Sequence, residues 1–320
     1  MRRALIVGAG VSGFLHALAL RAAGARIEGV FDPNRAQAEL LASLVGGHAT
    51  SSFALAQQME VDIAAVCSPP NVHVEQAEAL ARPDRLLFVE KPVALDLEGI
   101  ERLARLPRVV PIVQWRVGRA ARALAQLFHL EAFGPTPHLT IAIRAWRDHA
   151  YFDGGRRGRA HWGCGAMTSI GIHAIDLATF VIGRPVTSWS GTETYGRAGI
   201  DVTTRGSLAI TFEGGASADV SITVDEEGAN DVRLCVRGPA GSATLVATEA
   251  DPTTAPLSLR GNPRHVASSL PPSRGSCGMP LLVPYVKEAL DADARGAASV
   301  AIRDVAAAHL ATLATWNSRG

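Results

Sequence analysis

The sequence predicts an α/β fold: a doubly wound parallel sheet, followed by an α+β domain with a large open sheet that is mixed or antiparallel. Three observations predict it. Strand-like apolar runs alternate with helical segments early in the chain, a glycine-rich turn joins the first strand to the first helix, and alternating strands around a Gly-Gly pair appear only later. We expect the domains to span residues 1–117 and 118–320.

Composition favours a protein that binds small molecules. A chain of 320 residues is long for one core and comfortable for two domains. Hydrophobic residues make up 48% and charged residues 19%, with a net charge of +1. Because this charge gives no bias toward nucleic acid or anionic membranes, we expect neither as a partner.

The cysteines and the first residues indicate a cytoplasmic location. The four cysteines stand far apart, without the close pairs of a zinc site or a disulfide framework: Cys67, Cys164, Cys235 and Cys277. The apolar stretch 4–7 is too short for a signal peptide or a membrane span. We therefore expect a reducing compartment and no bound metal.

The first strand, at residues 4–7, runs into a glycine turn and an apolar helix. The turn contains Gly8, Gly10, Val11, Ser12 and Gly13. This order is that of the dinucleotide-binding fingerprint of Rossmann domains, in which the first glycine makes a tight turn, the second lets the backbone approach a pyrophosphate, and the third permits close helix packing. We predict that these five residues bind the cofactor.

A second strand, at residues 27–32, ends in Asp32, about twenty residues beyond the glycines. An acid at this spacing binds the ribose hydroxyls of NAD and repels the extra phosphate of NADP. Asp32 could also cap the next helix, because Asp32-Pro33-Asn34 resembles a helix start. We predict NAD as the cofactor, with NADP possible.

The remaining elements of the first part continue the alternation. Helices are expected at 35–45, 72–81 and 97–106, and strands at 62–67, 86–90 and 109–113, which makes five strands in a parallel sheet.

The strand at 86–90 delivers Glu90-Lys91-Pro92 to the carboxyl edge of this sheet, where open α/β sheets bind ligands. A lysine there, partly removed from water, can exchange a proton with a substrate. The alternative is a solvated Glu-Lys pair at a strand end.

The second part has a different character. A helix at 118–130 precedes a breaker at 134–137, and strands are expected at 139–146, 186–194, 207–212, 216–224, 232–236 and 243–246. Gly214-Gly215 is expected to form a two-residue hairpin turn, residues 251–280 a long irregular loop, and 282–294 and 303–318 the last helices. The alternating Leu208, Ile210 and Phe212 predict an apolar sheet face that pairs two chains.

Together, the glycine loop, Ser68-Pro69-Pro70, His73 and Glu90-Lys91-Pro92 resemble the Gfo/Idh/MocA family, named for glucose-fructose oxidoreductase and inositol 2-dehydrogenase. The resemblance implies a Rossmann domain that binds NAD or NADP, and a second domain whose open sheet often mediates oligomerisation. It further implies that Lys91 faces the oxygen of the reacting carbon and that the Lys91-Pro92 peptide is cis. The cofactor-binding residues it implies are Ser68, Pro69, His73, Glu90, Lys91 and Gln114.

Residues 163–176 resemble the family's helix that presents a histidine to that lysine, which implies an acid/base role for His173 and a structural one for Asp176. Ser169 stands where inositol-dehydrogenase-like members have an aspartate, which weakens the expectation of a simple inositol substrate. The family segment around Arg116 often contributes an arginine near substrate, and the alternative is a surface arginine.

Two other groups of polar residues give weaker signals. The run 156–159 contains three arginines that could meet a phosphate or carboxylate, although such a run is usually a solvated loop. His149, His161 and Cys164 are too irregularly spaced to predict a metal site.

The expected function is that of an NAD(P)-dependent oxidoreductase that interconverts a secondary alcohol and a ketone on a sugar, amino sugar, cyclitol or related polyol. We expect a homo-oligomer, a dimer or tetramer. The alternatives are a biosynthetic reductase of a keto-sugar or imine, and a non-catalytic NAD(P)-binding regulator.

Overall fold

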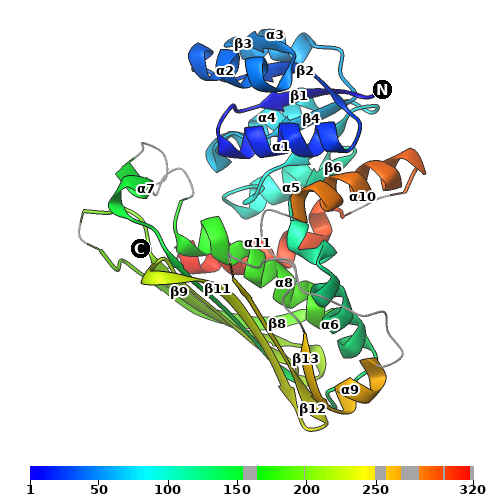
Figure 1. Ribbon diagram of the computed structural model, residues 1–320, viewed down its shortest axis with the longest axis vertical. Helices are drawn as coiled ribbons and strands as arrows, with labels where there is room; N and C mark the ends of the chain where they lie inside the picture. Colours follow the sequence, from blue (N-terminus) through cyan, green and yellow to red (C-terminus); the bar gives the residue numbers. More distant parts are fainter. Residues whose placement is uncertain (154–163, 198, 249–256, 268–280, 298–299, 318–320) are drawn as a thin grey trace. The chain divides into compact units, whose positions relative to one another are not determined.

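The computed structural model describes residues 1–153, 164–197, 199–248, 257–267, 281–297 and 300–317. It divides into two compact units, residues 1–112 with 282–306, and residues 113–281 with 307–320 (Figure 1). The expected division at 117/118 differs from these units mainly because residues 282–306 belong to the first unit.

The first unit is built on a sheet of six parallel strands in the order β3-β2-β1-β4-β5-β6. The strands are β1 (Arg3–Val7), β2 (Arg26–Phe31), β3 (His48–Thr50), β4 (Ile63–Val66), β5 (Leu86–Val89) and β6 (Val109–Pro111). This is the strand order of a doubly wound dinucleotide-binding fold, whose order reverses between β1 and β4. The crevice at that reversal is where such sheets bind ligands.

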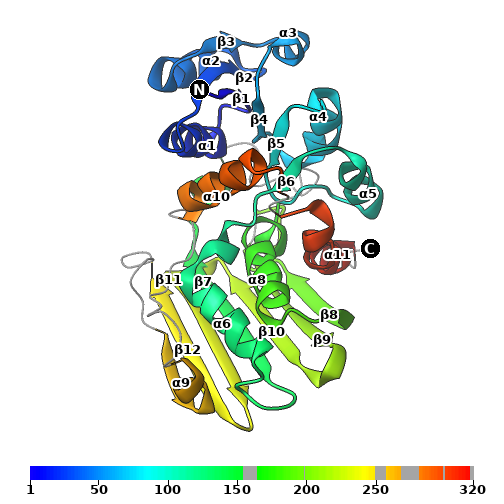
Figure 2. The same ribbon diagram turned by 90° about the vertical axis from the view of Figure 1, so that its right-hand side faces the viewer.

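Helices cover both faces of this sheet. They are α1 (Val11–Ala22), α2 (Arg35–Val45), α3 (Phe53–Gln58), α4 (His73–Leu80), α5 (Leu97–Arg105) and α10 (Leu282–Ala294). Figure 2 shows α1 and α10 on one side of the sheet and α4 and α5 on the other. Every residue of β4 and β5 is buried, which explains why these strands are uniformly apolar.

Two of these elements were not predicted. β3 is an edge strand of three residues, two of them exposed, and its sequence His-Ala-Thr carries no apolar pattern. The expectation of five strands was therefore one short. α3, which follows directly, begins at an N-cap in which Ser52 accepts from the Leu55 N–H.

Helix α10 comes from beyond the second sheet in sequence and packs against α1. Its buried face includes Leu282, Tyr285, Val286 and Ala289. The Tyr285 hydroxyl donates to the Pro111 carbonyl at the end of β6. The last helix, α11 (Ile302–Asn317), begins in the first unit and continues into the second.

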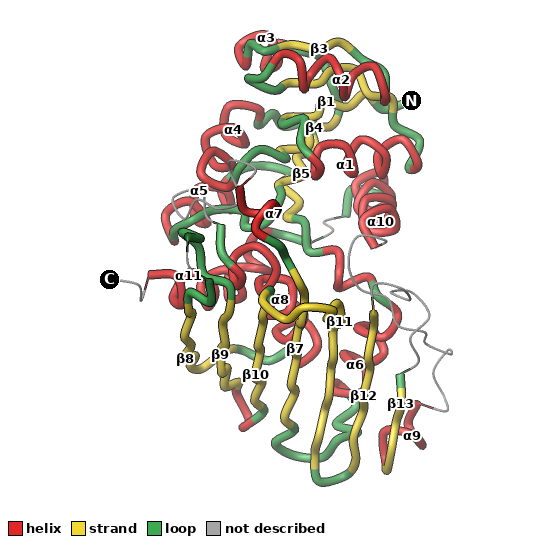
Figure 3. The backbone as a smooth tube through the Cα atoms, turned by 60° about the vertical axis from the view of Figure 1, so that its left-hand side comes forward, coloured by secondary structure: helices red, strands yellow, loops and turns green. Residues whose placement is uncertain are grey.

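The second unit is built on a mixed sheet of seven strands in the order β13-β12-β11-β7-β10-β9-β8 (Figure 3). The strands are β7 (His138–Trp146), β8 (Val186–Thr194), β9 (Arg205–Phe212), β10 (Ser217–Thr223), β11 (Asp225–Gly238), β12 (Gly241–Thr248) and β13 (Ser258–Gly261). Neighbouring strands are antiparallel except β7 and β10, which run parallel.

Helices cover one face of this sheet. α6 (Arg119–His129), α8 (Ile172–Ile182) and α11 pack on the inward side chains of the strands to form the main core. Leu208, Ile210 and Phe212 belong to this core and are almost fully buried. The prediction that they form an uncovered apolar face was wrong, because the chain's own helices cover it.

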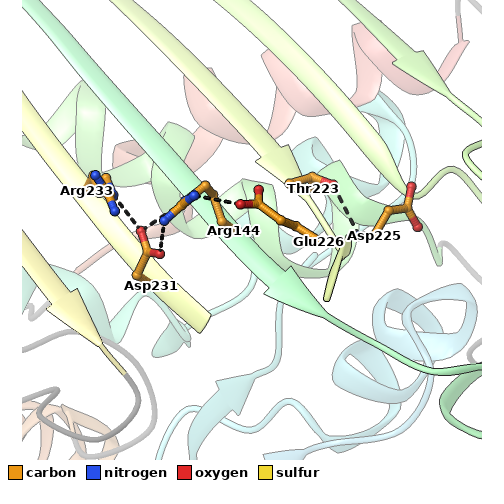
Figure 4. A network of polar contacts seen from close by, with 6 residues as sticks. All are labelled: Arg144, Thr223, Asp225, Glu226, Asp231 and Arg233. Atoms are coloured by element: carbon orange, nitrogen blue, oxygen red, sulfur yellow. Dashed lines mark hydrogen bonds and ion pairs between the residues drawn. The ribbon is translucent and has the colours of Figure 1, made fainter. Parts of the chain in front are cut away.

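The opposite face of the sheet is polar. Its residues on β9 and β10 include Ser207, Ala209, Thr211, Asp219 and Ser221, all exposed. A network of ion pairs lies at one end of this face, where a bulge interrupts the pairing of β11 with β7. There Arg144 contacts Glu226 and Asp231, and Asp231 also accepts from Arg233 (Figure 4). Burial raises the pKa of Asp231, but the two arginines outweigh this and lower it overall.

Two loop predictions need correction. The β9–β10 hairpin exists, but its turn has three residues, Glu213–Gly215, of which Gly214 and Gly215 have positive φ. Part of the expected loop at 251–280 is regular, because β13 and α9 (Asn262–Ala267) lie within it. Positions 251–256 and 268–280 are outside the described residues.

Candidate functional site

The turn between β1 and α1 is tightly built and open on one side. Gly8 has a φ of +100°, and a Cβ there would lie 2.8 Å from the Cys67 carbonyl carbon. A Cβ on Gly13 would lie 1.9 Å from the Gly8 carbonyl oxygen, so only glycine lets the helix pack so close. A Cβ on Gly10, by contrast, would meet no atom beyond its chain neighbours and its own helix backbone within 4 Å among the described residues.

Gly10 is also the N-cap of α1, a 12-residue helix, and it offers no capping side chain. The first-turn N–H groups and the positive end of the helix dipole suit an anion such as a pyrophosphate. Val11, 62% exposed, and the half-buried Ser12 lie in this first turn. Open space and uncapped N–H groups together fit the phosphates of a dinucleotide.

Asp32 is buried at the end of β2 and supports the glycine turn. One carboxylate oxygen accepts from the Ala9 N–H at 2.9 Å, and the other from the Asn34 N–H at 2.8 Å. The N-cap of α2 is Asn34, whose side chain accepts from two N–H groups of the first turn. The capping alternative for Asp32 therefore does not hold, and its carboxylate stays beside the glycine turn.

His73, fully buried, connects the turn after β4 to the turn after β5. Its ring nitrogens lie 2.8 Å from the Ser68 carbonyl and 2.8 Å from the Pro92 carbonyl. A neutral imidazole carries one N–H, so it can donate to only one of them. Burial lowers the pKa of His73, although both carbonyls and Glu90 oppose this. The half-buried Pro69 follows Ser68 in the turn thus held.

The Lys91-Pro92 peptide is cis, as the resemblance implied. Lys91 is half-buried and directly follows Glu90, whose carboxylate accepts from the Lys91 N–H at 3.0 Å. The other oxygen of Glu90 lies 2.9 Å from Nε2 of His16 on α1. Burial would raise the pKa of Glu90, but the bond to His16 and the charges of His16 and Lys91 lower it to about 2.

His16 was not identified from the sequence. The available signal was its position: it falls on the buried face of α1 with Gly13, Ala17 and Leu20, and a lone polar residue on such a face needs a partner. Because the partner comes from a strand more than seventy residues later, no local pattern reveals it.

In the second unit, two neighbouring residues of the 3-10 turn η2 (Gln114–Val117) contact α8. The Trp115 indole stacks on the His173 imidazole, with ring centroids 5.2 Å apart and an interplanar angle of 9°. Arg116 makes a bidentate pair with Asp176, at 2.6 and 2.9 Å. His173 and Asp176 are one helical turn apart, so the turn fixes the helix at two points.

The side chain of Arg116 is 11% exposed and that of Asp176 1%, so Arg116 is not a surface arginine. The pair gives Asp176 a structural contact, and the place of Arg116 near substrate stays a prediction. Burial raises the pKa of Asp176, which Arg116 opposes. Gln114, 3% exposed, leaves its side-chain oxygen without a hydrogen bond among the described residues.

His173 follows a π-helical turn, η4 (Met167–Gly171), that leads into α8. The Ile172 N–H donates to the Met167 carbonyl five residues back, and such π turns occur often at functional sites. His173 itself is 8% exposed. Ser169 lies within the π turn, where its hydroxyl accepts from the Gly165 N–H at 3.4 Å.

The predicted residues therefore form two groups. The glycine turn, Asp32, Ser68, Pro69, His73, Glu90 and Lys91 belong to the first unit, while Gln114, Arg116 and His173 belong to the second. The arginines of 156–159 and His161 fall outside the described residues. Within the described ranges, no cluster of three metal-ligating side chains occurs and no helix has the length and apolarity to cross a membrane.

Comparison with known proteins finds two family models that match successive parts of the chain. Residues 2–109 match the model of an oxidoreductase family with an NAD-binding Rossmann fold, and residues 121–244 match the model of the GFO/IDH/MocA C-terminal domain.

Individual relatives and solved structures agree with these models. An inositol 2-dehydrogenase of Saccharopolyspora erythraea is 28% identical over 75% of this chain and 72% of its own length. A scyllo-inositol 2-dehydrogenase (NAD(+)) of Bacillus subtilis is 25% identical over the same shares. The fold is that of the WlbA dehydrogenase of Bordetella pertussis, solved with NADH and UDP-GlcNAcA, with a TM-score of 0.84, 18% identity, and coverage of 99% of this chain and 96% of that one.

Proposed function

Because this chain belongs to the Gfo/Idh/MocA family of NAD-binding oxidoreductases, we propose that it interconverts a secondary alcohol and a ketone on a sugar, amino sugar, cyclitol or related polyol. The observation that carries the proposal is Glu90-Lys91 at the carboxyl end of β5. There each oxygen of the Glu90 carboxylate makes one hydrogen bond, to the His16 ring and to the Lys91 N–H. The second bond fixes the backbone of Lys91, which lies in the same unit as the open glycine turn.

Each residue has a part in this proposal. Gly8 to Gly13 hold the pyrophosphate on the N-terminus of α1, and Asp32 accepts from the adenosine ribose. Ser68, Pro69 and His73 are proposed to bind the cofactor as well. Gln114 is a further proposed cofactor ligand, supported by its buried side-chain oxygen, which has no hydrogen bond among the described residues. When bound, NAD supplies the carbon that accepts or returns a hydride.

Lys91 and His173 carry the proton chemistry in this proposal. The Lys91 ammonium donates to the substrate oxygen and stabilises negative charge that develops there. His173, oriented by its stack on Trp115, takes or gives the hydroxyl proton. Arg116 is committed to Asp176, so we propose that it serves the substrate site by holding α8 in place.

The substrate class rests on the relatives. Two of them are inositol dehydrogenases, while the structural neighbour was solved with a nucleotide sugar. Ser169 offers a neutral hydroxyl where a carboxylate would be expected for a simple inositol. A reductase of a keto-sugar or imine and a non-catalytic regulator are the alternatives, and the presence of both Lys91 and His173 favours an enzyme over a regulator.

The test is a panel of cyclitols, sugars, amino sugars and nucleotide sugars, incubated with the protein and NAD or NADP while reduced nucleotide is followed by absorbance. We expect substrate-dependent formation of NADH with at least one polyol. Nucleotide binding without turnover on any member of the panel, in either direction, would favour the regulator.

We further propose a homo-oligomer, a dimer or tetramer, in a cytoplasmic setting. The polar strand face left uncovered by α6, α8 and α11 supports the homo-oligomer. The thiols of Cys67 and Cys235, which form no disulfide among the described residues, support the cytoplasmic setting. Light scattering at micromolar concentration tests the homo-oligomer, and a monomer mass would contradict it. Cell fractionation tests the cytoplasmic setting.

A further inference from the structure

A chain of two hydrogen bonds runs from helix α1 to the backbone of Lys91. His16 lies on α1, one turn after Gly13, and is 1% exposed. Its Nε2 lies 2.9 Å from one oxygen of Glu90, and the other oxygen accepts from the Lys91 N–H at 3.0 Å. The helix whose N-terminus faces the phosphate site is thereby linked to the proposed catalytic lysine.

Packing alone does not explain a histidine here. Its second ring nitrogen, Nδ1, is buried and makes no hydrogen bond among the described residues. A buried polar atom without a partner costs stability, and a leucine or methionine would avoid that cost. The histidine is therefore explained by what its other nitrogen does for Glu90.

The bond to His16 favours the ionised form of Glu90. Its side chain is 12% exposed, and burial alone favours the protonated form. The charged or titratable groups that act on it are His16 from α1, Lys91 beside it, Cys67 at the end of β4 and His73 on α4. Of these groups, His16 makes a side-chain hydrogen bond to Glu90, and this bond lowers the pKa of Glu90 and so favours its ionised form.

We propose that His16 is a positioning residue: through Glu90 it holds the backbone of Lys91 in register with the helix that binds the cofactor phosphates. This inference rests on the proposed function, because it requires Lys91 to act on the substrate. Loss of His16 should misplace Lys91 while leaving the phosphate site intact, since the glycine turn is shaped by Gly8 and Gly13.

The test compares His16→Leu, which removes the bond, with His16→Gln, whose amide can replace the Nε2 donor. His48→Leu, on the exposed edge strand β3, is the matched control. We expect His16→Leu to lower kcat by about tenfold to a hundredfold, with NADH affinity changed less than about threefold. His16→Gln should recover most of the turnover, and His48→Leu should change neither quantity.

A second readout does not depend on turnover. In His16→Leu without nucleotide, Glu90 should take up a proton at a higher pH than in the unmodified protein, seen as an additional protonated-carboxyl infrared band. This additional band should be absent from the unmodified protein at the same pH and from His16→Leu/Glu90→Gln. Should His16→Leu fail to fold, His16→Met, which also removes the bond, is compared in the same way with His16→Met/Glu90→Gln.

Normal turnover and no such band in His16→Leu would overturn the positioning role. Its failure can be told from failure of the proposed function by Lys91→Met. If Lys91→Met abolishes turnover while His16→Leu does not, only the positioning role falls. If Lys91→Met keeps turnover, the proposed function itself fails.

Discussion

At the scale of single residues, Asp32 supports the glycine turn, and we propose that it also binds the nucleotide. Its carboxylate accepts from two main-chain amides, one of them in the glycine turn. The spacing from the glycines predicted an acid at this place, but not its bond to the Ala9 N–H. A substitution here should therefore affect both the shape of the turn and the choice of nucleotide.

We predict that the unmodified protein binds NADH more tightly than NADPH, and that Asp32→Ser reduces the difference between the two affinities. NADH affinity should fall by about tenfold, since a charge-assisted acceptor is lost. NADPH affinity should fall less, because the repulsion of its phosphate is relieved. Asp32→Asn, which keeps one acceptor oxygen without the charge, is the control, and fluorescence titration is the measurement. A preference for NADPH in the unmodified protein would contradict the prediction.

The residues missed by sequence analysis share one property. His16 and Trp115 act through partners distant in sequence, Glu90 and His173, so no spacing marks them. The glycines and Lys91, in contrast, belong to short motifs whose function depends on local backbone geometry. Sequence analysis therefore identified the residues of local motifs and missed residues whose partners lie far away in the chain.

At the scale of elements, long and uniformly buried strands were predictable and short polar ones were not. β4 and β5 are apolar because both sheet faces are covered, whereas β3 and β13 are short edge strands with mainly exposed side chains. The contact of η2 with α8 also escaped prediction, because Arg116 and its partner Asp176 are 60 residues apart in sequence.

The Arg116–Asp176 pair should contribute strongly to the stability of this contact. Arg116→Met leaves a buried carboxylate without its partner, which costs about 3–5 kcal/mol. Burial already raises the pKa of Asp176 and Arg116 opposes it, so the variant should raise it further. A carboxyl group whose pKa is higher in the folded than in the unfolded state makes the free energy of unfolding fall as the pH rises, because ionisation then favours the unfolded state. The destabilisation should therefore be larger at about pH 8 than at about pH 5.

Urea unfolding at both pH values measures this effect. Arg119→Met, at an exposed position on α6, is the matched control and should be nearly neutral. Arg116→Met/Asp176→Leu should recover part of the loss, because no charge is then buried. If Arg116→Met proves as stable as the control, the pair does not hold α8.

At the scale of the whole molecule, the chain order does not coincide with the structural units. α10 follows the second sheet in sequence yet packs on α1 in the first unit, which an amphipathic pattern near the end of the chain could not indicate. The residues predicted for function are likewise divided: the glycine turn, Asp32 and Lys91 belong to the first unit, and Gln114 and His173 to the second.

The most direct test of the central claim is the ratio of turnover to NADH affinity in Lys91→Met, measured on a substrate found in the panel. Losing one preorganised donor costs about 3 kcal/mol, and losing proton transfer costs roughly a further hundredfold in rate. We predict that turnover falls by several orders of magnitude while NADH affinity changes little, with a smaller fall in turnover for His173→Ala and a less than additive loss in the double variant. Near-normal turnover in Lys91→Met would contradict the assignment of this lysine as the chemical centre.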